Sequence, residues 1–407
     1  MRADEVRDTG ALLGRAGSDV TELARGIHRG VAGRVFGLLG APARPVQLLH
    51  DGICTIAYSA TRIGTSIVPA LVGTVAAAVH DRAAPSAHDS PGGRLTLAAV
   101  SGLIGDQLAD EYPTLAPELR LRTHEGPLRR SPGNVVEDLG PDATGRIVIF
   151  LHGLCGNDWY WQLGAERSLG DARTTFGSLL RDECGWTPLY ASYNTGLHIS
   201  ANGRALAALL EELVAGWPVG VERIALIGHS MGALVGRSAA QQGAKARHVW
   251  TRHLRDVVGL GGPHLGAPLE RLANWGSHRL GRLPETRPFA TLLNRRSVGI
   301  KDLRYGAVID EDWVGFDPDE PLCDRCTPAR LPPSIAHYAV AATLTRSPDG
   351  PFPMVGDLLV EYSSATGTGP LRRIPFEVER TMHIGRRHHL HLLSDPIVYA
   401  QLRTWLA

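Results

Sequence analysis

Ser230 lies in a sequence pattern that can make a serine hydroxyl a nucleophile. Residues 228–232 read Gly-His-Ser-Met-Gly, between the apolar run 224–227 and a helical stretch, 233–242. A serine in this context is typical of a nucleophile elbow, a tight turn that exposes the hydroxyl at the carboxyl edge of a sheet. Both glycines are needed where a Cβ would collide with the neighbouring strand or helix. We therefore predict Ser230 as the nucleophile, supported by Gly228 and Gly232, with His229 as a packing residue.

Two backbone N–H groups are expected to stabilise the negative charge that forms when such a serine attacks a carbonyl. One donor in an elbow is the residue after the serine, here Met231, and the second comes from the loop after an earlier strand. The apolar run 147–151 ends in His152-Gly153-Leu154, so Leu154 is the candidate second donor, supported by His152 and Gly153. Losing one such donor costs about 3 kcal/mol in comparable sites.

The acid that orients the base should follow the serine in the chain and precede the histidine. Asp349, Asp357 and Glu361 lie in the expected region. Asp349 sits in Ser-Pro-Asp-Gly, an ordinary turn composition. Asp357 lies where a loop re-enters apolar sequence, so we predict Asp357 as the acid and keep Asp349 as the alternate.

The base should lie in a loop just before the last helix, which we expect to begin at Asp395-Pro396. Several histidines crowd this part of the chain, and His389 and His391 are two residues apart. In an extended segment both would face the same side. The residues alone therefore leave His389 and His391 open. The other histidines of this region are expected to be exposed or locally bonded: His337, His383 and His388.

Five motifs together resemble the bacterial lipase and GPI inositol-deacylase-like branch of the α/β-hydrolases, over roughly residues 95–407. In that branch the histidine that opens the H-x-x-L-L run is the base, which selects His389. The acid there usually lies in Gly-Asp-Gly-Leu-Val, and this chain has Leu358 in place of the second glycine. The resemblance implies hydrolysis of carboxylic esters, lipid or acyl, through an acyl-enzyme. The motifs span residues 152–158, 228–232, 260–269, 356–360 and 389–398.

The elements that must position these residues follow a strand–helix alternation. Four short, continuously apolar runs suit strands buried on both faces of a mostly parallel, doubly wound sheet. Between them lie amphipathic helices, most clearly over 203–217. The fold class predicted is therefore the α/β-hydrolase fold. The four runs are 147–151, 224–227, 257–260 and 338–342.

The chain is longer than this fold needs, and the excess falls in two places. Residues 1–80 read as helical and 81–93 as a linker, giving an N-terminal accessory segment over 1–93 and a hydrolase domain over 94–407. An aromatic-bearing insertion over about 268–334 is the expected cap or lid. It contains Cys323 and Cys326, which have the spacing of half a zinc site. No second pair of ligands follows them, so a zinc site is not predicted.

An apolar stripe recurs every fourth residue from Ile63 to Val79. We expect it to pack on the protein's own body, with a peripheral membrane contact through the N-terminal helices as the alternative. The uncharged stretch is at the lower length limit for spanning a bilayer and is diluted by small residues, so no membrane span is predicted. The first residues carry both charge signs and lack an apolar core, so no signal peptide is predicted. The expected location is cytoplasmic, with membrane association as the alternative.

A formal net charge of +1 over 407 residues gives no electrostatic footprint for nucleic acid. Five cysteines do not suggest a disulfide scaffold. The leading function is a serine esterase or lipase in lipid metabolism that acts on a small-molecule ester and needs no metal or organic cofactor. Two alternatives stay open: acyl transfer from the same acyl-enzyme to another acceptor, and a non-catalytic scaffold.

Overall fold

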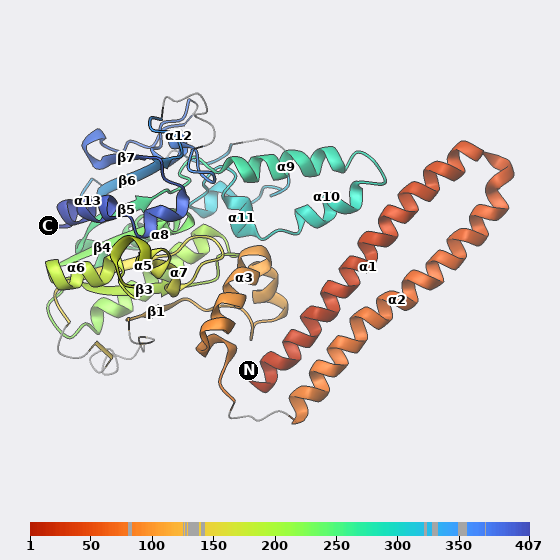
Figure 1. The fold of residues 1–407 in the computed structure, drawn as a ribbon, viewed down its shortest axis with the longest axis horizontal. Helices are drawn as coiled ribbons and strands as arrows, with labels where there is room; N and C mark the ends of the chain where they lie inside the picture. The colour runs from red at the N-terminus through yellow and green to blue at the C-terminus, as the bar shows by residue number, and fades with distance from the viewer. Residues whose placement is uncertain are drawn as a thin grey trace. The chain divides into compact units, whose positions relative to one another are not determined.

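The computed structural model describes residues 1–79, 84–124, 126, 128, 138–139, 143–320, 324–327, 333–348, 356–370 and 372–407. The chain divides into two compact units (Figure 1). The helical unit comprises Met1–Leu97, Gln107–Ala116 and Leu272–Arg296, and the sheet unit comprises Ala98–Asp106, Pro117–Arg271 and Ser297–Ala407. The predicted boundary after residue 93 stays a prediction. Part of the predicted 268–334 insertion, Leu272–Arg296, groups with the N-terminal helices.

The sheet unit is built on a seven-stranded sheet in the order β1-β3-β2-β4-β5-β6-β7. Only β1 is antiparallel to its neighbour; the remaining strand pairs are parallel. The four predicted strands are β2, β4, β5 and β6. The bounds of each strand agree with the predicted apolar run to within a few residues. The strand bounds are β1 Arg120–Arg122, β2 Arg146–Leu151, β3 Thr187–Ser192, β4 Arg223–His229, β5 Leu254–Leu260, β6 Ala336–Thr343 and β7 Thr381–Gly385.

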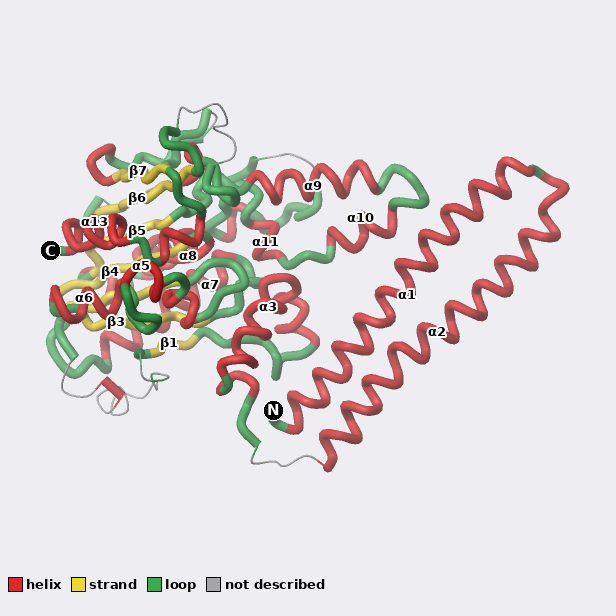
Figure 2. Tube along the Cα trace, viewed as in Figure 1, coloured by secondary structure: helices red, strands yellow, loops and turns green. Residues whose placement is uncertain are grey.

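Helices cover both faces of the sheet (Figure 2). Successive side chains of a strand point to opposite faces. Ile147 and Ile149 accordingly pack in one core with residues of α7 and α8, while Val148 and Phe150 pack in a second core with residues of α6 and α13. Burial on both faces is why the strands are apolar without alternation, as predicted.

The remaining helices connect or flank these layers. The final helix begins as predicted, because the Asp395 carboxylate accepts a hydrogen bond from the Ile397 N–H at 2.8 Å. The helices of the described chain, apart from short 3-10 turns, are α1 Ala3–Leu39, α2 Arg44–Val79, α3 Pro91–Glu111, α5 Ala165–Leu169, α6 Phe176–Cys184, α7 Ile199–Ala215, α8 Met231–Ala246, α9 Pro268–Leu280, α10 Arg287–Asn294, α11 Val298–Asp302, α12 Tyr362–Ala365 and α13 Pro396–Leu406.

In the helical unit, α1 and α2 form a long antiparallel hairpin (Figure 1). Small residues bring the two backbones close together. A Cβ added at Gly14 would lie 2.3 Å from the Ser66 carbonyl oxygen, and one at Gly10 would lie 2.7 Å from the Gly73 Cα. The hairpin therefore depends on glycines at these crossings, because any side chain there would force the helices apart.

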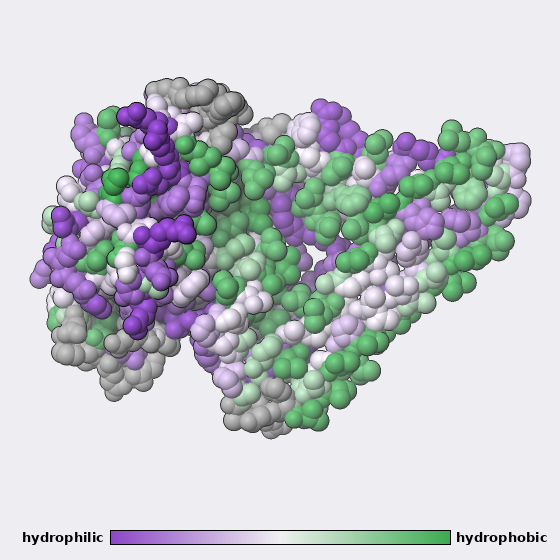
Figure 3. Space-filling model, viewed as in Figure 1, coloured by the Kyte–Doolittle hydropathy of each residue, from purple (hydrophilic) through white to green (hydrophobic). Residues whose placement is uncertain are grey.

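The apolar stripe of α2 faces away from this contact, which corrects the sequence prediction. Ile63, Ile67 and Leu71 are 54%, 55% and 59% exposed, so the stripe is not the face that packs within the helical unit. The helix packs on α1 through its small-residue face instead. Figure 3 shows apolar atoms along the outer edge of α2. By length and composition, Ala41–Val79 is the one described segment apolar enough to cross a membrane.

Candidate active site

Ser230 occupies a strained turn between β4 and α8. Its backbone has φ 54° and ψ −124°, a region that L side chains rarely adopt. The turn is tight enough to require both flanking glycines. A Cβ on Gly228 would lie 2.3 Å from the Ala233 nitrogen, and one on Gly232 would lie 2.2 Å from the Leu151 carbonyl oxygen. The positive φ at Ser230 and the two close approaches are the features that the predicted nucleophile elbow requires.

Asp357 and His389 form a buried pair. Their side chains are 1% and 4% exposed, and His389 Nδ1 lies 2.7 Å from Asp357 Oδ2. The other carboxylate oxygen, Oδ1, accepts hydrogen bonds from the N–H groups of Leu359 at 3.1 Å and Val360 at 2.8 Å. Because the carboxylate is fixed by the backbone, it can hold the imidazole in one orientation and one tautomer.

The turn that carries Asp357 places Leu358 in an unusual backbone conformation. This residue has φ 89°, a conformation that favours glycine, and its side chain is 61% exposed. A leucine can occupy this position because its side chain projects into solvent. The cost of the positive φ is of the order of 1–2 kcal/mol.

Ser230 and His389 meet at the end of β5. The Ser230 N–H donates to the Leu260 carbonyl oxygen over 2.9 Å. A Cβ on the next residue, Gly261, would lie 3.0 Å from His389 Cε1. The His389 Nε2 is buried and has no hydrogen-bond partner, so it is not bonded to the Ser230 hydroxyl in this structure. Catalytic hydrogen bonds are often long without substrate, so this nitrogen keeps a free lone pair for a proton.

The loop after β2 lies beside the elbow, as predicted. A Cβ on Gly153 would lie 3.0 Å from the Ser230 Cβ. The buried His152 accepts from the Tyr193 N–H through Nε2 at 3.3 Å, and its Nδ1 lies 2.9 Å from the Gly153 carbonyl oxygen. Burial lowers the pKa of His152 to about 4, so this ring is a neutral brace of the loop. The predicted donors directly follow these two neighbouring residues: Leu154 follows Gly153, and Met231 follows Ser230.

Cys155 is no rival to Ser230 in this geometry. Burial raises the pKa of its thiol, and its Sγ lies 3.7 Å from the Ala99 carbonyl oxygen. The thiolate, which is the reactive form, is therefore disfavoured. Its backbone N–H donates to the Thr195 hydroxyl over 3.2 Å, which fixes the loop that carries Leu154.

His229 does more than fill space. It is fully buried, and its Nε2 lies 3.1 Å from the backbone oxygen of His389, so the ring donates to the loop that carries His389. Burial, followed by the nearby His389, lowers the pKa of His229 well below its usual value, so the ring is neutral. Its place directly before Ser230 was visible in the sequence, but the contact across 160 positions was not.

The other candidates lie elsewhere. The His391 Nδ1 accepts from the His388 N–H at 3.1 Å, so His391 closes its own turn rather than facing Asp357. The His383 Nε2 lies 2.8 Å from the Thr343 hydroxyl. The prediction for His337 was wrong, because this residue lies inside β6 and is buried with neither ring nitrogen hydrogen-bonded. Glu361 is paired with Arg271 at 3.4 Å. The alternate acid, Asp349, lies outside the described residues.

Comparisons with known proteins find one family match and several similar solved structures. Residues 142–316 match the model of a family described as the PGAP1-like alpha/beta domain. No curated protein matches the chain. Among solved structures, the mature Bacillus licheniformis lipase BlEst2 is 17% identical, over 66% of this chain and 94% of that chain, with a TM-score of 0.41. A Pyrobaculum calidifontis esterase is 12% identical, over 83% and 95%, with a TM-score of 0.39.

The matched region covers the elbow and the loop after β2 but ends before Asp357 and His389. Residues 142–316 are therefore similar to the PGAP1-like alpha/beta domain, and the chain folds as a seven-stranded, mostly parallel sheet of the α/β class.

Proposed function

We propose that the protein is a serine hydrolase that cleaves carboxylic esters. Ser230 is the nucleophile, His389 the base and Asp357 the residue that orients the base. The observation that carries the proposal is the buried Asp357–His389 pair beside the strained Ser230, with the His389 Nε2 left unpaired. The unpaired Nε2 matters here because the other nitrogen of the same ring is held by a carboxylate at 2.7 Å, the arrangement that a serine hydrolase base requires.

The chemistry follows from these positions. The Ser230 Oγ attacks the ester carbonyl carbon while its proton moves to the His389 Nε2. The N–H groups of Leu154 and Met231 bind the oxyanion of the tetrahedral intermediate. Its collapse breaks the ester bond, and His389 returns the proton to the leaving alcohol. Water then attacks the acyl-enzyme by the same steps and releases the carboxylic acid and free Ser230.

Labelling with a fluorophosphonate probe tests this assignment. The wild type should be labelled and Ser230→Ala should not, because the probe reacts with an activated serine hydroxyl. Ser334→Ala, at an exposed position, is the matched control and should label like the wild type. Unchanged labelling of Ser230→Ala, or an unlabelled wild type with no turnover of p-nitrophenyl esters from short to long acyl chains, would reject the proposal.

We further propose that the helical unit contacts a lipid surface through α2. The exposed positions Leu49, Ile53, Ile56, Ile63 and Ile67 lie on the face of α2 opposite its contact with α1. The only Lys, Arg, Asp or Glu residues in this helix of 36 residues are Arg44, Asp51 and Arg62. A long apolar face with so few charges loses little by entering a headgroup region and gains the free energy of apolar burial.

A lipid surface fits this face better than a protein partner does. The helix is unbroken over 36 residues, and its exposed apolar positions run along much of that length. Exposed apolar areas of this extent are rare on monomeric soluble proteins. The close glycine crossings between α1 and α2 are also the packing mode used by helices in lipid. Such a contact would bring a lipid ester hydrolase to its substrate.

A further inference from the structure

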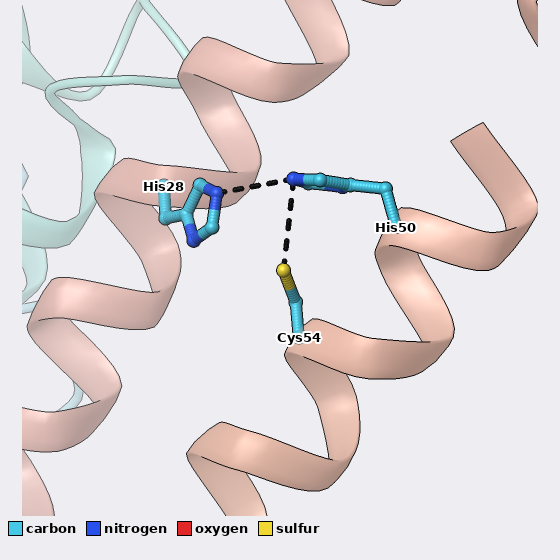
Figure 4. A group of neighbouring side chains, drawn as sticks. All are labelled: His28, His50 and Cys54. Atoms are coloured by element: carbon cyan, nitrogen blue, oxygen red, sulfur yellow. Dashed lines mark hydrogen bonds between the residues drawn. The ribbon is translucent and has the colours of Figure 1, made fainter. Parts of the chain in front are cut away.

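Three side chains of the types that commonly ligate transition metals converge between α1 and α2, outside the site described above. His28 comes from α1, and His50 and Cys54 come from α2 (Figure 4). The Nε2 atoms of the two histidines lie 3.2 Å apart, and the Cys54 Sγ lies 3.6 Å from the His50 Nε2. All three donor atoms lie within 4.8 Å of one another. We propose that this group binds a divalent transition metal of the zinc class.

Two of the three separations fit a tetrahedral ion, and the third, between His28 and Cys54, is within 4.8 Å. Bond lengths of about 2.0–2.1 Å to imidazole nitrogen and about 2.3 Å to thiolate sulfur place two nitrogens about 3.4 Å apart and a nitrogen and a sulfur about 3.6 Å apart. The observed 3.2 Å and 3.6 Å match these values closely. His50 and Cys54 are four positions apart on one helix, the spacing that places two side chains on the same face.

The outer ring nitrogens also have partners suited to metal-bound histidines. The His50 Nδ1 lies 3.1 Å from the Asp51 carboxylate, and the His28 Nδ1 lies 3.1 Å from the Tyr58 hydroxyl. Metal-binding histidines nearly always use the second nitrogen in this way, which fixes the tautomer and strengthens the ligand. With a proton on Nδ1, each ring directs the lone pair of Nε2 toward the centre of the group.

Without a metal, the single lone pair of the His50 Nε2 can accept a hydrogen bond from the His28 ring or from the Cys54 thiol, but not well from both. An ionised Asp51 can only accept, so a neutral His50 must carry its proton on Nδ1. Its Nε2 is then an acceptor that faces both a second imidazole nitrogen and a thiol sulfur. A single cation replaces these competing contacts with three bonds. Three protein ligands leave the fourth tetrahedral position to water or another ligand.

The inferred ion would clip the two helices together. His28 and His50 are 22 positions apart in the chain, on opposite sides of the turn between α1 and α2. A metal that binds only the folded hairpin stabilises it by linkage. The clip needs none of the catalytic residues, so it can be tested independently of the proposed hydrolase activity.

Cobalt(II) is the probe that distinguishes this site from adventitious binding. The full chain, reduced and stripped of metal, should bind about one equivalent of Co²⁺ with thiolate-to-cobalt charge-transfer absorption, and Zn²⁺ should displace it. The titration should be done with Cys323 and Cys326 both replaced by serine, so that Cys54 is the thiolate under test. Cys184→Ser in that background is the matched control and should keep the band.

Two substitutions decide the outcome. Cys54→Ser should abolish the charge-transfer band, and His50→Gln should lower Co²⁺ affinity by more than about 100-fold, beyond the effect of losing an outer partner. Asp51→Asn should weaken binding about 10–100-fold without removing the band. Zn²⁺ should raise the unfolding temperature of the parent protein but not of Cys54→Ser. An undiminished band in Cys54→Ser, or no band in the parent, would overturn the proposal.

Discussion

The His389 Nδ1 lies 2.7 Å from the Asp357 Oδ2, and the backbone N–H of His389 donates to the carbonyl oxygen of Asp357 over 3.1 Å. The two loops are therefore joined by backbone as well as by side chain. A substitution at the Asp357 side chain leaves the backbone bond in place. The pair can be separated chemically without releasing the loop that carries His389.

Asp357→Asn should lower kcat about 10⁴-fold with little change in KM. The asparagine oxygen can still accept from Leu359 and Val360, which turns the amide NH₂ toward His389. The ring must then accept at Nδ1 and carry its proton on Nε2, so it cannot take the Ser230 proton. Steady-state kinetics on a p-nitrophenyl ester measures this. Glu361→Gln is the control and should change kcat only a few-fold; a loss within about 10-fold for Asp357→Asn would exclude Asp357 as the acid.

Replacing two glycines of α8 by alanine should change the free energy of unfolding in opposite directions. Gly232→Ala places a Cβ 2.2 Å from a backbone oxygen of β2, so the free energy of unfolding should fall by about 1–3 kcal/mol. At Gly236 the nearest atom is a flexible Leu151 methyl at 3.1 Å, and alanine should gain up to about 1 kcal/mol of helix propensity. Urea unfolding of the two variants measures this difference. Equal unfolding midpoints for Gly232→Ala and Gly236→Ala would contradict the close approach of Gly232 to β2.

His337 should make the fold sensitive to acid. It is buried in β6 with neither ring nitrogen hydrogen-bonded, and burial lowers its pKa from 6.5 to about 3. Between these values the unfolded chain binds a proton that the folded chain does not, so stability falls as pH falls through that window. This histidine alone should cost about 2 kcal/mol between pH 7 and pH 5.

His337→Leu should remove that contribution. The difference in unfolding free energy between pH 7 and pH 5 should shrink by about 2 kcal/mol relative to the wild type. His124→Leu, at an exposed position, should leave the difference unchanged. Denaturant unfolding at the two pH values provides the measurement, and an equal pH dependence in His337→Leu and the wild type would show that His337 is not held neutral.

The outer face of α2 should bind neutral phosphatidylcholine vesicles. Burying an isoleucine or leucine is worth about 1.5–3 kcal/mol, so Ile67→Glu with Leu71→Glu should weaken partitioning at least about 100-fold. Val219→Glu with Ile397→Glu adds the same charge at exposed apolar positions of the sheet unit and should bind like the wild type. Flotation on a density gradient measures this. Recovery of a protein dimer instead of lipid-bound chains would point to a second copy as the occupant.

Local patterns predicted the parts of the fold that depend on neighbouring residues. The elbow around Ser230 follows from two glycines and a flanking strand, and a Cβ at either glycine does meet backbone atoms. Strands β2, β4, β5 and β6 follow from their uninterrupted apolar runs. The predicted base could not be identified from local sequence alone. His389 and His391 share a local pattern, and only the resemblance selected between them.

Contacts between residues that are far apart in the chain could not be predicted from the sequence. Periodicity found the apolar stripe of α2 but not the side on which the helix packs, and small residues such as Ser66 and Gly73 set that side by allowing close approach to α1. The same hairpin brings His28 beside His50 and Cys54, a meeting that no short motif encodes. The bond from His229 to the His389 loop likewise exists only after the sheet has formed.

The position of the α1–α2 hairpin ahead of the strands in the chain matters during synthesis. The hairpin of α1 and α2 leaves the ribosome before any strand of the sheet, and its partners are close in sequence, so it can form early. Its outward apolar side is then presented while the sheet is still being translated. A nascent chain captured by lipid at this stage would complete its hydrolase fold already tethered, so the first two helices would determine where the enzyme matures.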